Sequence, residues 1–456
     1  MTTLDGRLTG HRPSSPPRPA RARPAHLLVI VAVGAAGVIG LWWHDTPAIS
    51  GVGDWLTNAG RITGLLAGYT VIVLLALMAR VPALERGVGT DRLARWHAMG
   101  GRYTVCLVIA HALLITWGYS VTAHTGVVHQ TKTLLVSYPD VLMATVAGLL
   151  FVGIGVVSAR AARRRMRYET WYYLHLYTYL AIALAFSHQF ADGAEFMTNL
   201  PARVLWSVLY AGVGCLLVWY RFVTPLRGAY RHRLRVAGVE IEARGVVSVY
   251  IQGKRLDELR AEPGQFFRWR FLTRKLAWAA NPYSLSAPVR PDLIRITVKN
   301  SGRHSAALRR LRPGTRVLAE GPYGAFTAGR RRRRKVLLLA GGVGITPIRA
   351  LFETLPGGPG DITLVYRTTK RADLVFENEL TQIASARGAA TYYIVGSRAE
   401  LGWDPLSPEG LTRVVSGIAD HDVYVCGPEG MMTAAIAALR EVGVPRRHIH
   451  HESFEF

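Results

Sequence analysis

Cysteine is scarce in this chain of 456 residues, which has only Cys106, Cys215 and Cys426 and no Cys-x-x-Cys pair. Iron–sulfur clusters and all-thiolate zinc sites need four cysteine ligands, so the chain cannot build either by itself. Three widely separated cysteines also give no disulfide framework, which argues against a small secreted protein held together by disulfides.

Charged residues are also few, at 19% against about 25% in average soluble domains, while apolar residues make up 50% of the chain. The mean hydropathy is positive, at +0.18. This composition excludes an intrinsically disordered or collagen-like chain. It predicts membrane-spanning segments, and the length is sufficient for about three domains.

Acidic side chains are outnumbered, with 30 Asp and Glu against 55 Lys and Arg, and the formal net charge is +25. An excess of this size raises the question of nucleic-acid binding. Arginines gather, however, in the segments that flank the apolar runs, where they would meet anionic lipid. The basic run at 330–335 is interpreted as a solvated linker between domains. We therefore predict membrane lipid as a partner and no nucleic acid.

Several stretches without Asp, Glu, Lys or Arg occupy the first half of the chain. They are 24–44, 62–79, 103–131, 141–159, 170–191 and 204–220. A helix of about 20 residues crosses the hydrocarbon core of a bilayer, and six such runs in succession are poorly explained as buried core helices. We predict a six-helix transmembrane domain over 26–225, preceded by a disordered basic tail over 1–25. The third helix is expected to begin near His97.

Basic residues are distributed unevenly between the two ends of this predicted bundle. Arginines crowd the N-terminal tail and the loops after the second, fourth and sixth runs. The intervening loops, 45–58, 119–139 and 189–200, hold only Lys132. Short arginine-rich loops stay in the cytoplasm. We therefore expect a multi-pass protein of the plasma membrane with both termini in the cytoplasm.

Histidines inside the predicted spans are the first candidates for chemistry. His97 and His111 lie fourteen residues apart in the third helix, and His175 and His188 lie thirteen apart in the fifth. At about 1.5 Å per residue, each helix separates its two imidazoles by roughly 20 Å. Ionisable residues within a membrane are costly and usually functional, and imidazole is a common axial ligand of haem iron. Matched pairs on two helices predict two bis-histidine haem sites, although a single histidine is more simply a polar packing residue.

This arrangement, together with the segment at 80–101, resembles the ferric-reductase-like transmembrane domain shared by ferric reductases and NADPH oxidases, in its bacterial branch. The resemblance implies that His97 and His175 ligate an inner haem b, and that His111 and His188 ligate an outer one. It also suggests partners for the haem propionates. These are Arg92, Arg95 and Arg102 for the inner haem, and Arg61 for the outer haem unless it is a plain interfacial arginine.

From about Tyr230 the pattern changes to short alternating runs such as 246–252 and 293–299, which predicts a small antiparallel β-barrel over 230–330. Within it the residues Asn281-Pro282-Tyr283-Ser284-Leu285-Ser286 resemble the flavin motif of the ferredoxin-reductase superfamily. The resemblance implies an FAD site with Tyr283 beside the isoalloxazine and with Ser284 and Ser286 bonded to its edge. That family usually has Arg or His where this chain has Asn281. The residues implied to wrap the FAD pyrophosphate are Lys299, Gly302 and Ser305.

The segment 337–351 reads as a strand, a glycine-rich turn and the start of a helix. It begins a predicted Rossmann-like α/β nucleotide domain over 335–456. The glycines let a backbone approach a pyrophosphate at a helix N-terminus, and the next residues match the superfamily's nucleotide half. The residues concerned are Gly341, Gly342, Gly344, Thr346 and Pro347.

Cations follow the second strand of this domain, at Arg367, Lys370 and Arg371. Cations at this position bind a 2′-phosphate, which favours NADPH, with NADH as the alternative. Solvated loop charges are the other interpretation.

Two further motifs complete the resemblance to a flavin reductase. Cys426-Gly427-Pro428 resembles the turn beside the nicotinamide, and the chain ends with the family's Glu-x-Phe pattern. The implied catalytic residues are Cys426, Glu452 and Phe454, with Phe454 stacked on the flavin and Phe456 as the alternative ring.

The assembled parts predict an NAD(P)H-dependent oxidoreductase. Flavin converts the two electrons of a hydride into the single electrons that haem accepts. We expect electrons to pass from cytosolic NADPH through FAD and two haems to an extracytoplasmic acceptor. A ferric chelate is favoured because the outer loops are short and nearly free of cations. A superoxide-generating NADPH oxidase and a transporter with a nucleotide-sensing domain are the alternatives, and no obligate protein partner is evident.

Overall fold

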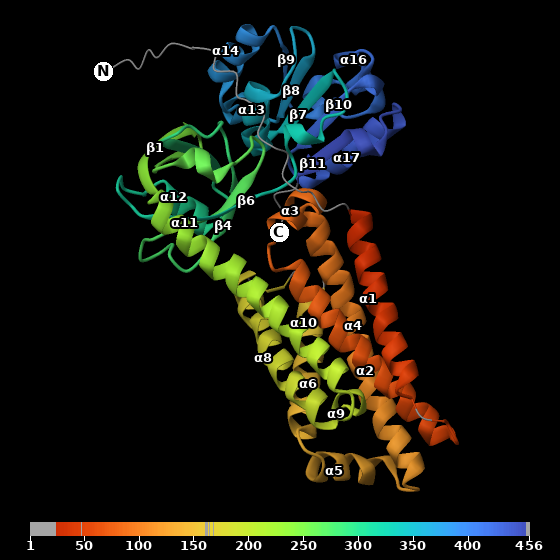
Figure 1. Cartoon of the computed structure of the whole chain (residues 1–456). Helices are drawn as coiled ribbons and strands as arrows, with labels where there is room; N and C mark the ends of the chain where they lie inside the picture. The colour runs from red at the N-terminus through yellow and green to blue at the C-terminus, as the bar shows by residue number, and fades with distance from the viewer. Residues whose placement is uncertain (1–23, 47, 160–162, 164, 167, 453–456) are drawn as a thin grey trace.

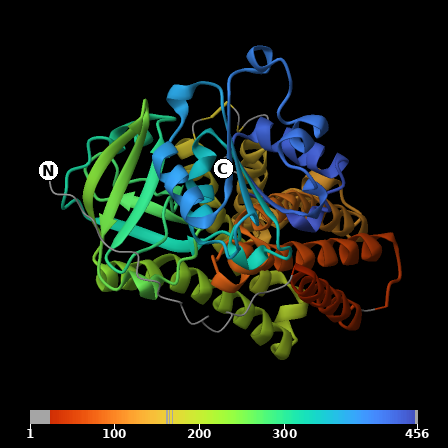
Figure 2. The same cartoon turned by 90° about the horizontal axis from the view of Figure 1, so that it is seen from above.

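The structure of the chain is a computed structural model that describes residues 24–46, 48–159, 163, 165–166 and 168–452. A bundle of long helices carries two sheet-containing domains at one end (Figure 1). Seen from above, the antiparallel sheets and the α/β domain lie side by side over the helix ends (Figure 2). The predicted tail over 1–25 lies almost wholly outside the described residues.

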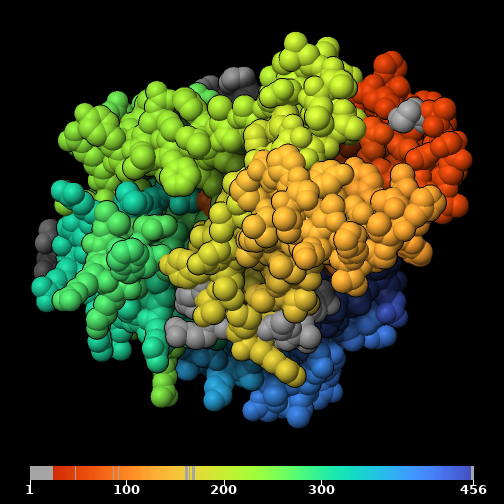
Figure 3. Space-filling model, turned by 90° about the horizontal axis from the view of Figure 1, so that it is seen from below, coloured from red at the N-terminus to blue at the C-terminus, as the bar shows by residue number. Residues whose placement is uncertain are grey.

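The helices of the bundle follow one another with short connections. They are α1 (Pro24–His44), α2 (Val52–Leu77), α3 (Pro82–Val88), α4 (Thr90–Thr122), α5 (Val127–Ser137), α6 (Val141–Ser158), α8 (Tyr168–Asp192), α9 (Ala194–Met197), α10 (Leu200–Val218), a π-helix (Trp219–Val223) and α11 (Thr224–His232). In the view from below, the part of the chain around α5 lies across the far end of the bundle, next to α9 and α10 (Figure 3).

Five helices within the described residues are long and apolar enough to cross a membrane. They lie at Pro24–His44, Val52–Leu77, Arg92–Thr122, Val141–Ser158 and Leu200–His232. Helix α8 corresponds to the fifth predicted run and has 25 residues, about 38 Å of helix. It is less apolar because tyrosines and histidines replace aliphatic residues. Six spans therefore stay a prediction.

Two helices begin earlier than the predicted spans, and in α2 the charge that bounded the run is paired. The run at 62–79 was bounded by Arg61, but α2 starts at Val52 and Arg61 forms an ion pair with buried Glu195 at 2.6 Å. Helix α4 starts at Thr90 rather than near His97.

Six strands in two three-stranded antiparallel sheets follow the bundle. They are β1 (Arg235–Ala243), β2 (Val246–Gln252), β3 (Phe266–Phe271), β4 (Asn281–Ser284), β5 (Leu293–Lys299) and β6 (Val317–Tyr323), with α12 (Arg303–Leu308) before β6. The sheet orders are β1-β2-β5 and β4-β3-β6. Both contribute to one apolar core that includes the fully buried Trp269 and Phe271. Two isolated bridges join the sheets, and a closed barrel stays a prediction.

The last part of the chain is a parallel sheet between helices. Its elements are β7 (Val336–Gly341), α13 (Ile345–Thr354), β8 (Ile362–Thr368), α14 (Glu377–Arg387), β9 (Ala390–Val395), α15 (Arg398–Leu401), α16 (Pro408–Val414), β10 (Asp422–Cys426), α17 (Glu429–Glu441) and β11 (Ile449–Glu452). The order β11-β10-β7-β8-β9 brings β7 and β10 together at the centre. Their carboxyl ends form one edge, which is where ligands bind in sheets of this type.

Candidate functional site

Four histidines lie in two facing pairs between α4 and α8. The ring centroids of His97 and His175 are 6.0 Å apart, with their planes at 72°. Those of His111 and His188 are 6.4 Å apart, at 60°. The first pair lies nearer the sheets, because α4 starts beside α3 at that end of the bundle (Figure 1). The structure therefore brings together the pairs that the helical spacing predicted.

One nitrogen of each imidazole has a hydrogen-bond partner in the protein. The Nδ1 partners are the carbonyl of Leu74 for His97 (3.3 Å), the carbonyl of Gly60 for His111 (2.8 Å), Oγ of Ser158 for His175 (3.5 Å) and Oδ2 of Asp192 for His188 (3.1 Å). Carbonyl and carboxylate oxygens only accept, so Nδ1 carries the proton where they are the partner. This leaves the lone pair on Nε2, as in metal-ligating histidines.

The separation within each pair suits a metal between the two rings. A metal–imidazole bond is about 2 Å, so two imidazoles on opposite sides of one ion have ring centroids roughly 6–6.5 Å apart. The observed separations match this value. Among the described residues there is no group of three His, Cys, Asp or Glu that could hold a metal alone. The residues fit a haem, whose iron the two histidines of each pair would hold.

Helix α2 makes room for this site through small residues that the sequence analysis did not single out. A Cβ on Gly64 would lie 2.6 Å from Nδ1 of His111, and a Cβ on Gly60 would lie 2.8 Å from Ile115. Glycines four residues apart let two membrane helices approach closely. The spacing Gly60, Gly64 and Gly68 was the available signal.

The arginines expected at the propionates have different positions. Arg92, Arg95 and Arg102 are exposed on α4. Arg61 is committed to Glu195 and to Oδ1 of Asn58, at 2.9 Å. At the His97–His175 pair, Trp171 stacks on His175 with centroids 5.3 Å apart, and Arg163 lies 4.3 Å from the Trp171 ring centroid. Trp171 precedes His175 by four residues, a spacing that places two side chains on one helix face.

The predicted flavin motif lies on β4 and just after it. The hydroxyl of Tyr283 is 3.3 Å from Nδ1 of His304, and burial raises the Tyr283 pKa, so the phenol stays neutral. Ser284 is buried. Nδ2 of Asn281 is buried without a hydrogen-bond partner within the described part of the chain. A buried amide that lacks a partner here is what a bound cofactor would satisfy, and FAD fits this place.

Some of the other residues expected around FAD form hydrogen bonds within the protein. Oγ of Ser305 accepts hydrogen bonds from the Ser301 and Gly302 amides at 2.9 and 3.1 Å, which shapes the loop before α12. Lys299 is exposed at the end of β5. Ser286 is fully buried, and its Oγ accepts a hydrogen bond from Thr297 at 2.8 Å.

A buried ion cluster joins this region to the α/β domain. Arg295 on β5 donates to both carboxylate oxygens of Glu379 on α14, at 2.7 and 3.0 Å, and Arg349 on α13 donates to the same group at 2.8 Å. Burial alone would raise the Glu379 pKa, but the hydrogen bond from Arg295 and the two positive charges hold it below its ordinary value. The cluster fixes the two halves of the reductase module against each other.

The two nucleotide turns pack backbone against backbone. A Cβ on Gly344 would lie 2.2 Å from the Cys426 carbonyl, and a Cβ on Gly341 would lie 2.0 Å from Sδ of Met431. Gly427 lies beside Gly341, and Pro428 precedes α17. Only glycine fits at such approaches.

The remaining residues of the glycine-rich turn are arranged for different purposes. Gly342 has a φ of +52° and faces open space. Thr346 and Pro347 are buried in the first turn of α13. The turn therefore presents backbone at the carboxyl edge of the sheet, where a pyrophosphate would lie.

The end of the described chain lies next to this edge. Cys426 and Glu452 are register partners on β10 and β11, and Cys426 Sγ is 3.6 Å from the Glu452 carbonyl. Burial raises the pKa of the Cys426 thiol, so it stays protonated and is no nucleophile. A Cβ on Gly324, at the end of β6, would lie 3.0 Å from the Glu452 carboxylate. Phe454 and Phe456 lie outside the described residues.

The predicted phosphate-binding cations lie at the end of β8. Arg367 pairs in register with Gly341, and its guanidinium contacts the Thr368 and Ile394 carbonyls. Lys370 and Arg371 are exposed, and Arg371 forms an ion pair with Glu377 at 2.8 Å. Arg398, at the start of α15, is a further cation near Arg367. Burial and the Arg398 charge lower the Arg367 pKa.

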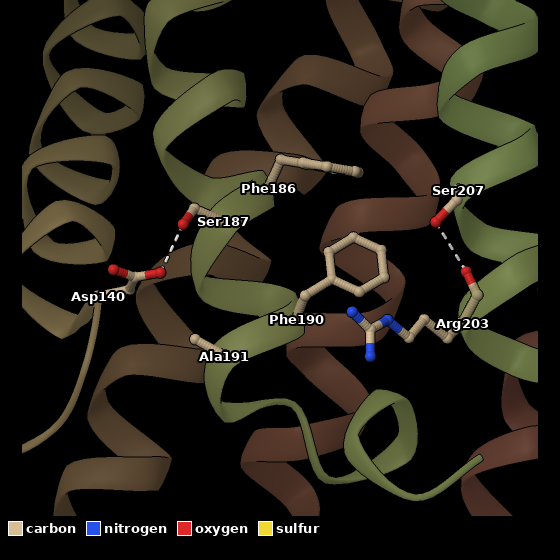
Figure 4. A pocket seen from close by; sticks show the side chains of 7 residues that line it. All are labelled: Asp140, Phe186, Ser187, Phe190, Ala191, Arg203 and Ser207. Atoms are coloured by element: carbon tan, nitrogen blue, oxygen red, sulfur yellow. Dashed lines mark hydrogen bonds between the residues drawn. The ribbon is translucent and has the colours of Figure 1, made fainter. Parts of the chain in front are cut away.

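A surface pocket of about 570 Å³ lies at the far end of the bundle. Asp140, Phe186, Ser187, Phe190, Ala191, Arg203 and Ser207 line it (Figure 4). Ser187 donates to Asp140 at 2.5 Å, and the Arg203 guanidinium lies 5.7 Å from the Phe190 ring centroid. Ser187 and Ala191 flank His188 along α8. The pocket therefore has one cation and one carboxylate among its lining residues, beside the helix of the far pair.

Comparisons with known proteins match both halves of the chain. The family model of the ferric reductase like transmembrane component matches residues 63–186, which include three of the four histidines. The oxidoreductase NAD-binding domain matches residues 338–436, which include both nucleotide turns.

Curated relatives match over the length of a reductase module. The ferredoxin reductase component of 3-ketosteroid-9-alpha-monooxygenase from Mycolicibacterium smegmatis is 31% identical over 238 residues, 50% of this chain and 67% of its own length. The glycine betaine monooxygenase reductase subunit from Chromohalobacter salexigens is 30% identical, over 42% of this chain and 56% of its own length. The FAD/NAD-binding domain of nitric oxide dioxygenase from Vibrio cholerae is 24% identical, with a TM-score of 0.41, over 48% of this chain and 97% of that structure.

The chain belongs to the oxidoreductase family in which a ferric-reductase-like transmembrane component is joined to a ferredoxin-reductase-type NAD-binding module. It is a membrane-associated, NAD(P)H-dependent oxidoreductase with an FAD-binding reductase module.

Proposed function

We propose that this protein transfers electrons across the plasma membrane, from cytosolic NADPH through FAD and two b-type haems to ferric chelates outside the cytoplasm. The observation that carries this proposal is the pair of facing imidazoles at each of two depths, with Nδ1 of each ring bonded to the protein. Two such sites along one pair of helices form a path through the bilayer.

The residues of this chain hold the cofactors and exclude side reactions. Bound FAD would accept hydride from NADPH and pass single electrons to the haems. Tyr283 and Asn281 border the flavin, the glycine-rich turn receives the pyrophosphate of the nucleotide, and the protonated Cys426 thiol stays inert beside the nicotinamide. We propose His97 and His175 as ligands of the inner haem and His111 and His188 as ligands of the outer haem.

The orientation follows from the arginine-rich loops, which place the reductase module and both termini in the cytoplasm. The pocket beside the outer pair is lined by both Arg203 and Asp140, so we expect it to discriminate little between acceptors of different charge. Such a surface suits outer-sphere transfer to a diffusing iron complex. It does not require a protein partner to complete the path.

Spectroscopy of the purified protein tests the haems, and turnover tests the acceptor. We expect b-type bands in the reduced-minus-oxidised spectrum, and NADPH oxidation in membranes that rises when ferric citrate is added. Absence of the bands would contradict the haem assignment and leave the transporter alternative. Turnover that ignores ferric citrate and produces stoichiometric superoxide would identify the oxidase alternative.

NADPH is expected to be preferred over NADH. Neutralising Arg367, Lys370 and Arg371 together should lower the ratio of kcat/KM for NADPH to that for NADH about tenfold or more. The loss should arise mainly in KM, since the 2′-phosphate is remote from hydride transfer. The measurement is steady-state kinetics with both nucleotides, with Arg440→Gln on the exposed side of α17 as the control. Equal kcat/KM for the two nucleotides in the unaltered protein would show that the preference does not exist.

A further inference from the structure

One short segment of the membrane domain reaches the antiparallel sheets. It contains Arg80, α3 and Gly89, and it connects the ends of α2 and α4. We call residues 80–89 the docking loop. Helix α3 packs against β6, and Figure 1 shows it at the end of the bundle beside the sheets.

Arg80 makes the strongest polar contact of the docking loop. Its guanidinium forms an ion pair with the Glu320 carboxylate on β6, and the two side chains are only 17% and 15% exposed. Arg268 on β3 lies 3.6 Å from the same carboxylate. The Arg80 guanidinium also lies 5.7 Å from the centroid of the Tyr323 ring. An ion pair this shielded from water is far less weakened by salt than a surface pair.

The backbone at Arg80 is held by these contacts. Its φ is +62°, a left-handed conformation that residues other than glycine adopt at a cost. Nearby, Nη2 of Arg330 donates to the Gly87 carbonyl at 3.1 Å, and a Cβ on Gly89 would lie 3.9 Å from Ala325. Both β6 and Arg330 of the reductase module therefore contact the docking loop.

The docking loop lies between the two redox sites of the proposed path. Leu74, whose carbonyl is bonded to Nδ1 of His97, precedes Arg80 by six residues in the chain. On the other side, Tyr323 pairs in register with Phe266 on β3, and Phe266 pairs with Ser284 of the flavin motif. The Arg80–Glu320 pair thus joins the end of the flavin site to the end of the inner histidine pair.

We propose that Arg80 is a positioning residue for electron transfer, and that its ion pair with Glu320 holds the reductase module where flavin-to-haem transfer requires it. This proposal rests on the proposed function. Electron transfer between two fixed centres slows steeply as their separation grows, so a reductase module that shifts away from the bundle would reduce the haem more slowly. Hydride transfer within the reductase module does not involve the docking loop.

The test uses the full-length protein in Arg80→Glu, Glu320→Gln and the double swap Arg80→Glu Glu320→Arg. Arg309→Glu, an exposed arginine after α12, is the control for charge. In stopped-flow experiments with NADPH, flavin reduction should keep its rate in all variants. Haem reduction should slow about tenfold or more in Arg80→Glu, less in Glu320→Gln, and recover in the double swap.

Hydrogen exchange gives a readout that does not depend on turnover. The backbone at 81–89 and 317–323 should exchange faster in Arg80→Glu and return to the unaltered rate in the double swap. Unchanged exchange in Arg80→Glu would overturn the proposal, and so would haem reduction that is as fast as in the control. A protein without haem bands would instead contradict the proposed function, while exchange would still decide whether Arg80 docks the module.

Discussion

The His175→Ala variant is expected to lose the inner haem and to stop electron flow beyond the flavin. The imidazole of His175 faces His97 at a ring separation that suits one shared iron, and in the variant only His97 would remain to hold it. The His175→Ala His188→Ala double variant should lose both haems. Haem content measured by pyridine extraction, together with the reduced-minus-oxidised spectrum, checks both variants.

The control for this experiment is His124→Ala, which replaces an exposed histidine in the loop after α4. It should keep both haems. Flavin reduction by NADPH should also survive in His175→Ala, because the reductase module is a separate part of the chain. Full haem content in the double variant would refute the assignment of these histidines.

Gly344→Ala is expected to abolish NADPH-driven flavin reduction. The new Cβ would lie 2.2 Å from the Cys426 carbonyl and 2.7 Å from the Gly427 amide nitrogen, so the two nucleotide turns would have to separate. Both turns border the proposed nucleotide site, and we expect kcat/KM for NADPH to fall about a hundredfold or more. Stopped-flow measurement of flavin bleaching checks this.

Gly430→Ala is the matched control, because a Cβ at that position in α17 meets nothing within 4 Å. It should leave the rate close to that of the unaltered protein. Dithionite should still reduce the haems in Gly344→Ala, since the membrane domain is untouched. Normal NADPH kinetics in Gly344→Ala would mean that the two turns do not form the nucleotide site.

Local patterns predicted the features that local physics determines. The spacing of histidines along each helix predicted which imidazoles share a depth, because the rise per residue and a common direction fix depth; the structure shows these pairs facing each other. The glycine-rich turn was recognised because its backbone has to approach other groups closely. Both depend on residues near each other in the chain.

Features that depend on distant residues could not be read in the same way. The second span was predicted to start after Arg61 because a charged residue ends an apolar run. Arg61 nevertheless lies within α2, because it pairs with Glu195, 134 residues later in the chain. Arg295 occupies what looks like the solvent face of an alternating strand, yet Glu379, 84 residues later, buries it. No periodicity reveals such a partner.

The helix boundaries and the hydrogen-bond partners of individual side chains could not be predicted from the sequence either. A hydroxyl such as that of Ser305 could bind a phosphate, but its Oγ accepts hydrogen bonds from the amides of its own loop. Helix α8 has few charged residues, which is typical of a membrane span, but its many tyrosines make it less apolar than the other long helices.

The helical segment from Leu200 to His232 carries a consequence for how the two halves of the protein can move. It runs without a break from the bundle through a π-turn to His232, which two residues separate from the first strand of the sheets, and Arg221 donates to the Met78 carbonyl at 2.8 Å. Pro225, which has no N–H to donate, follows the π-turn. A rod of this kind sets angle as well as distance, since adding one residue would turn everything beyond it by about 100°. The number of residues in this one helix therefore sets the orientation of the reductase module relative to the bundle.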